Sequence, residues 1–139
     1  MKTIIACLAT ACFAVPAVAQ PPSETPPEVA ELIAGIVEDT GVTPFGQTFL
    51  RELDDAESET VEVAVAPDKL TYVQLMGNEY TNAIWVHASA GGREIAMSKA
   101  DKGDPVLQIP AGNGNKVSLK IEMNCGYAVC QYFIQTFVR

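Results

Sequence analysis

Two kinds of hydrophobic periodicity divide the chain near residue 59. Between residues 28 and 58 the apolar side chains recur three or four positions apart, which is the spacing of an amphipathic helix. From Glu59 onward apolar and polar residues alternate, as they do along a half-buried strand. The pattern predicts an acidic helical segment at 28–58 and a β domain at 59–139.

The first predicted helix follows a short proline-rich lead at residues 20–27 and ends at Gly41. Thr25 and Glu28 are spaced as in a capping box, and Pro26 is tolerated at the first helical position. Glycine is the residue most often found just past a helix end. The apolar face of this helix consists of Val29, Leu32, Ile33, Ile36 and Val37.

A second helix is predicted to begin at Thr43-Pro44 and to end in the solvated acidic run at residues 54–59. Gly46 and Thr48 have low helix propensity and weaken this prediction. The apolar face of the second helix would contain Phe45, Phe49, Leu50 and Leu53.

Seven short segments of the β domain have strand character, because they alternate or are rich in β-branched and aromatic residues. Turns containing Gly, Pro, Asn and Asp separate them, a pattern typical of an antiparallel sandwich or barrel. The predicted strands are 61–66, 70–76, 83–89, 94–98, 106–109, 116–123 and 130–138.

The first 19 residues have the layout of a secretory signal peptide. Lys2 gives a positive start, an apolar run follows at residues 4–15, and Ala17-Val18-Ala19 offers a small-residue cleavage site. The apolar run is shorter than the roughly 20 residues of a membrane-spanning helix. We expect cleavage after residue 19 and a periplasmic or secreted protein without a transmembrane segment. Lipidation of Cys12 is the alternative.

Charge narrows the possible partners. The formal charge is −8, and it becomes −9 without residues 1–19, which contain one basic and no acidic residue. Eleven acidic residues and one basic residue lie between Glu24 and Glu62, whereas six acidic and seven basic residues follow. Phosphate binding needs a surplus of Lys and Arg, so we expect no nucleic-acid partner.

Cys125 and Cys130 are the two cysteines that remain after signal removal, and an even pair in an exported chain indicates a disulfide. Five residues of extended chain span roughly 16 Å, but a disulfide requires Cα atoms about 4.4–6.8 Å apart. The chain must therefore reverse between the two cysteines. The C-x-x-x-x-C spacing differs from the C-x-x-C of thiol oxidoreductases, which favours a structural bond.

We interpret this reversal as a β-hairpin between the segments 116–123 and 130–138. With Cys125 opposite Cys130, antiparallel register pairs Met123 with Tyr132, Ile121 with Ile134, Leu119 with Thr136, and Val117 with Val138. The predicted fold class is mainly β. It is an antiparallel β-sandwich of about seven strands, with an N-terminal α-helical segment and a disulfide-closed C-terminal hairpin.

Phe133 and Phe137 would lie on the opposite, polar face of this hairpin. Two interpretations compete: the N-terminal helical segment packs over both rings, or the rings form an exposed aromatic patch that binds a ligand.

Trp85 and His87 share one face of the strand 83–89 and form the best local candidate for a stacking surface. A catalytic histidine needs a nucleophile and an orienting acid, and neither a G-x-S-x-G nor an H-E-x-x-H motif is present. The clustered carboxylates at 52–59 lie in a solvated run. Turn chemistry accounts for four possible calcium ligands, Asp101, Asp104, Asn113 and Asn115. We predict no catalytic residue, metal or cofactor.

The β body resembles small secreted sandwich modules such as bacterial pre-peptidase C-terminal domains. The resemblance consists of short strands, Gly/Asn/Asp turns and a final strand after Gly126-Tyr127, and it implies no particular function. The sequence predicts an exported, non-enzymatic binding module of the bacterial cell envelope with a protein or carbohydrate ligand. A small periplasmic hydrolase using carboxylates or His87, and a structural envelope protein, are the alternatives.

Overall fold

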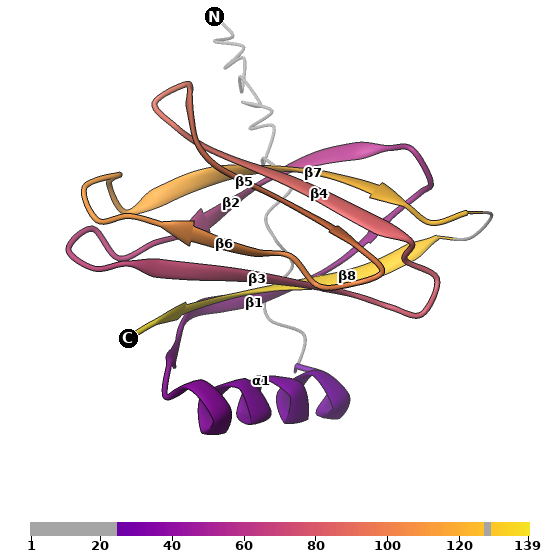
Figure 1. Cartoon of the computed structure of the whole chain (residues 1–139), viewed down its shortest axis with the longest axis horizontal. Coiled ribbons are helices and arrows are strands. Elements are labelled where there is room, and N and C mark those ends of the chain that lie inside the picture. Colours follow the sequence, from indigo (N-terminus) through magenta and orange to yellow (C-terminus); the bar gives the residue numbers. More distant parts are fainter. Residues whose placement is uncertain (1–24, 127–128) are drawn as a thin grey trace, which may run out of the picture.

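The computed structural model describes residues 25–126 and 129–139. It contains one helix, α1 (Pro27–Thr40), followed by eight strands (Figure 1). The predicted signal peptide, Cys12 and most of the proline-rich lead lie outside the described residues. The strands are β1 (Thr43–Leu53), β2 (Ser58–Ala64), β3 (Thr71–Gly77), β4 (Ala83–Ala90), β5 (Arg93–Asp101), β6 (Val106–Ile109), β7 (Lys116–Asn124) and β8 (Cys130–Val138).

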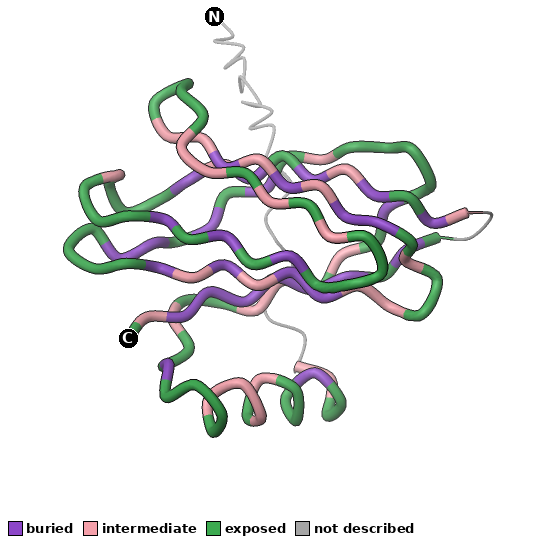
Figure 2. Tube along the Cα trace, viewed as in Figure 1, coloured by how far each residue is buried: buried purple, intermediate pink, exposed green. Residues whose placement is uncertain are grey.

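The strands form two antiparallel sheets that pack face to face as a β-sandwich, as the fold class predicted. One sheet has the order β1-β8-β3-β6, and α1 lies against its outer side; we call it the helix-side sheet (Figure 1). The other has the order β2-β7-β4-β5, and we call it the far sheet. Figure 2 shows buried positions alternating with exposed ones along most strands.

The apolar side chains at alternate positions of the strands fill the space between the two sheets. Val61 and Val63 of β2, and Ile121 of β7, point inward from the far sheet and are almost fully buried. Leu75 and Ile134 meet them from the helix-side sheet. Burial of each such side chain contributes about 1.5–3 kcal/mol, so the core is the main source of stability.

All seven predicted strands are present, but the predicted second helix is wrong, because residues 43–53 form strand β1. β1 pairs with β8 and contains a bulge between Phe45 and Phe49, where three residues lie opposite the single residue Gln135. Gly46 enters the bulge with φ = 74°, a conformation that glycine adopts without strain. The bulge interrupts the alternation of inward and outward side chains along β1. The apolar residues of this strand are therefore spaced three or four positions apart in places, as they would be in a helix.

Helix α1 ends as predicted but begins differently. Gly41 adopts a left-handed conformation and donates its N–H to the Val37 carbonyl over 2.9 Å. The predicted capping box is wrong, because Pro26 occupies the N-cap and no side chain caps the helix. Proline at these first positions has no N–H that needs a partner, and its φ suits the helix entry.

The disulfide between Cys125 and Cys130 is present, with the Cα atoms 5.5 Å apart. The predicted register between β7 and β8, the strands on either side of the disulfide, is wrong, however. β7 pairs with β2 and β4, whereas β8 pairs with β1 and β3. The chain crosses from the far sheet to the helix-side sheet at this point, so the disulfide closes an arch between the two sheets. Met123 and Ile121 of β7 lie on one wall of the core, and their expected partners Tyr132 and Ile134 lie on the other.

Candidate functional site

Helix α1 covers the aromatic face of the helix-side sheet. Phe133 is 6% exposed and packs in a small cluster with Val29 of the helix and Met76 of β3; Ile33 and Ile36 border it. Phe137 is also buried. The interpretation in which the helix packs over this face is therefore confirmed for Phe133, and burial of both rings excludes an exposed Phe133–Phe137 binding patch.

The far sheet has a different outer face. Trp85 and His87 are half-buried and point outward from β4, and they alternate with the buried Ile84, Val86 and Ala88. This is the shared face that the sequence predicts for Trp85 and His87.

The neighbours of Trp85 and His87 are mostly charged. In the register of the sheet, Trp85 lies between Glu122 of β7 and Lys99 of β5. The Lys99 ammonium is 4.9 Å from the centroid of the indole ring, which is a cation–π distance. His87 Nδ1 lies 2.6 Å from Glu94 Oε1.

A pocket of about 390 Å³ opens beside Trp85 on the side of β7, away from β5. The loop between β1 and β2 forms its other wall, and two hydrogen bonds fix that loop. Ala56 N–H donates to the Met123 carbonyl over 3.3 Å, and Asp55 Oδ1 accepts from Cys125 N–H over 2.9 Å. We call this hollow the Trp85 pocket, and its lining residues are Asp55, Ala56, Glu57, Ser58, Trp85, Glu122, Met123 and Asn124.

Two of the four possible calcium ligands make hydrogen bonds within the protein. Asp104 accepts a hydrogen bond from Gly77 N–H, and partial burial raises the pKa of its carboxyl. Asn113 Nδ2 donates to the Pro110 carbonyl within its own turn. Within residues 25–126 and 129–139, no group of three or more His, Cys, Asp and Glu side chains has the geometry to hold a metal ion.

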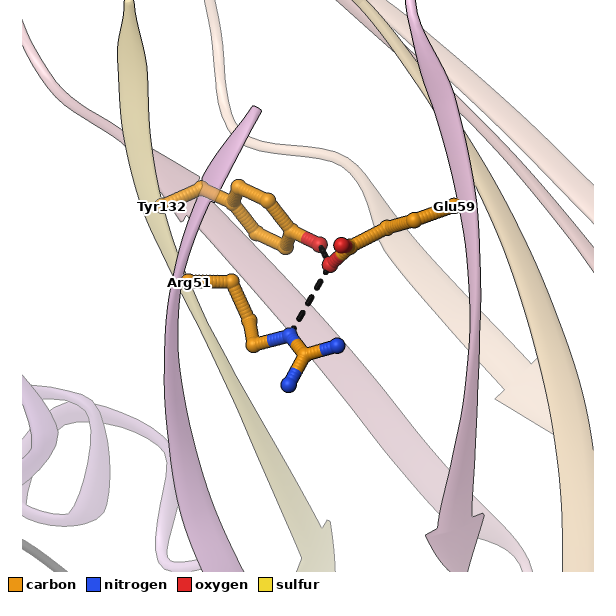
Figure 3. A network of polar contacts seen from close by, with 3 residues as sticks. All are labelled: Arg51, Glu59 and Tyr132. Atoms are coloured by element: carbon orange, nitrogen blue, oxygen red, sulfur yellow. Dashed lines mark hydrogen bonds and ion pairs between the residues drawn. The ribbon is translucent and has the colours of Figure 1, made fainter. Parts of the chain in front are cut away.

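A polar network that sequence reasoning missed lies between the two sheets (Figure 3). Glu59 of β2 accepts hydrogen bonds from the Arg51 guanidinium of β1, over 3.0 Å, and from the Tyr132 hydroxyl of β8. Burial, followed by the hydrogen bond and the charge of Glu59, raises the pKa of Tyr132 well above its usual value. The network links the edge strand of one sheet to the edge strand of the other.

We expect the network to make the protein sensitive to alkali. The folded state keeps the Tyr132 proton that the unfolded chain releases near pH 10. The contribution of Tyr132 to the free energy of unfolding is therefore complete below about pH 10. Above that pH the contribution falls by at most about 1.4 kcal/mol per pH unit. Tyr132→Phe should flatten this decline in urea unfolding between pH 8 and 11.5, whereas Tyr80→Phe, at an exposed tyrosine, should not. An unchanged slope in Tyr132→Phe would contradict the assignment.

One further observation concerns the helix. Within the described part of the chain, no helix is long and apolar enough to span a membrane.

Comparison of the chain with protein-family models and with curated protein sequences finds no match. A β-sandwich by itself supports many functions, and the surface around Trp85 is the candidate functional site of this one.

Proposed function

We propose that the protein is an exported, non-enzymatic binding module of the bacterial cell envelope, and that it binds its ligand on the far sheet around Trp85. The observation that carries this proposal is the difference between the two outer faces. Helix α1 covers the face containing Phe133, while Trp85 stays partly exposed beside a pocket. A partly exposed aromatic ring in a concave polar surface is a common feature of binding sites.

Export is supported by two independent features. The sequence begins with the layout of a signal peptide, and Cys125 and Cys130 form a buried disulfide, a bond that persists in oxidising compartments. The proposed location is therefore the periplasm or the extracellular space.

A binding role fits the side chains around Trp85 better than catalysis does. His87 and Ser89 share the outer face of β4, but His87 Nδ1 forms its hydrogen bond with Glu94 Oε1. Glu94 is more than half exposed, so this pair lies in water and not in a closed site. The ligand classes that we propose are a protein or a carbohydrate, since both use aromatic stacking and polar contacts at such surfaces.

Trp85 also provides the test, because it is the only tryptophan in the chain. The purified protein is titrated with envelope oligosaccharides and with fractionated envelope proteins while Trp85 emission is recorded. We expect at least one component to give a saturable change. Its affinity, measured by calorimetry, should fall at least tenfold in Trp85→Ala and stay unchanged in Tyr80→Ala, which removes an exposed aromatic ring elsewhere.

Two results would overturn the proposal. Equal affinity of the component for the wild type and for Trp85→Ala would place the binding surface elsewhere. Chemical turnover of a bound component, lost on substitution of His87 or Glu57, would make the protein an enzyme.

A further inference from the structure

The Trp85 pocket combines an aromatic wall with carboxylates. Asp55, Glu57 and Glu122 line it together with the indole, and no Lys or Arg is among the lining residues. Lys120 lies 3.4 Å from Glu122 and offsets part of that charge from outside the pocket. The remaining charge is negative, in a chain whose formal charge is −8.

Trp85 already interacts with one cation. Lys99 reaches the indole from the β5 side, at 4.9 Å from the ring centroid, and a carboxylate oxygen of Asp101 lies 3.5 Å from the same ammonium. The pocket lies on the β7 side of Trp85, where none of the lining residues comes from β5. The side of Trp85 that faces the pocket is therefore not occupied by Lys99.

A cation fits this pocket better than a neutral ligand. A neutral molecule would remove water from the carboxylates without supplying a compensating positive charge, which is costly. An ammonium or guanidinium group would pair with Glu57 and Glu122 and contact the indole, as cationic ligands do in aromatic cages. The pocket wall is fixed in advance by the two hydrogen bonds of the β1–β2 loop, so little ordering is lost on binding.

We infer that the Trp85 pocket binds an organic cation, an alkylammonium or guanidinium group held between the indole of Trp85 and the carboxylates of Glu57 and Glu122. This inference rests on the proposed binding surface around Trp85, and it adds a small organic cation to the protein and carbohydrate ligands proposed above. The cation is either a free small ammonium compound or the basic side chain of a partner protein, and the two sources present the same chemistry to the pocket.

The test uses a matched pair of probes and calorimetry on the full protein. Choline carries a quaternary ammonium, and 3,3-dimethyl-1-butanol has the same shape without the charge. We expect choline, or a tri-arginine peptide, to bind at least tenfold more tightly than the neutral alcohol and to change Trp85 emission. Tighter binding of the peptide than of choline would identify a basic partner protein, and the opposite order a free ammonium compound.

Charge-matched variants separate the pocket from the overall charge of the chain. Glu57→Gln/Glu122→Gln should weaken cation binding at least tenfold. Glu31→Gln/Glu38→Gln removes the same charge from exposed positions of α1 and should leave affinity within twofold. Equal weakening in both double variants, or equal binding of choline and its neutral analogue, would overturn the inference. A neutral oligosaccharide that binds through Trp85 would overturn it as well, but would leave the proposed binding function intact.

Discussion

Phe133→Ala is expected to lower the free energy of unfolding by about 3–5 kcal/mol, the usual cost of truncating a buried phenylalanine. The ring is held between α1 and the helix-side sheet, where it contacts the cluster formed by Val29 and Met76. Val29 is the only residue of α1 that is fully buried. Loss of the ring should therefore also detach the helix, and urea unfolding together with amide exchange of α1 measures both effects.

Leu32→Ala is the matched control, since Leu32 is on the same helix but is 52% exposed. This change should stay within about 0.5 kcal/mol of the wild type, as surface substitutions usually do. If Phe133→Ala cost no more than Leu32→Ala, or if exchange in α1 were unchanged, the packing of the helix on this sheet would be contradicted.

Replacement of both Cys125 and Cys130 by alanine is expected to cost about 2–4 kcal/mol. The chain-entropy model gives about 2 kcal/mol for so short a loop, and loss of two buried sulfur atoms adds a packing cost. The disulfide also has a local role, because Cys125 N–H holds Asp55 and thus one wall of the Trp85 pocket. A lower urea midpoint and altered Trp85 emission are the expected measurements.

Reduction of the wild-type protein by dithiothreitol in urea provides the control, because it breaks the bond without changing the sequence. The free energies of unfolding of the reduced wild type and of the alanine variant should agree within about 1 kcal/mol. An alanine variant as stable as the oxidised wild type would show that the arch between the sheets holds its geometry without the bond.

Alternation in the sequence predicted which face each strand buries, but it did not predict the partner strand. Ile121 and Ile134 point into the core whether their strands are neighbours in one sheet or lie on opposite walls of the sandwich. The short disulfide loop allows both arrangements, because Cα atoms 5.5 Å apart fit a hairpin or an arch equally well. In the structure β2 and β4 occupy both edges of β7, and β1 and β3 occupy both edges of β8, so β7 and β8 do not pair with each other.

The network around Glu59 left a signal that the prediction did not use. Glu59 lies two residues before Val61 and four before Val63, on the same face of β2. The alternation that predicts inward side chains for the two valines therefore also predicts one for Glu59. The surrounding acidic run indicated solvent instead. For the candidate site, sequence reasoning found Trp85 and His87, but it could not find the pocket, because Glu57 and Glu122 come together only through the β2–β7 pairing.

The position of β8 has a consequence for the order of folding. Its neighbours in the helix-side sheet are β1 and β3, so the first strand of the sequence cannot find its partner until the last strand has been synthesised. Pairings between such distant segments fold slowly. A chain of this topology therefore remains without a completed helix-side sheet until its last strand, β8, has been synthesised.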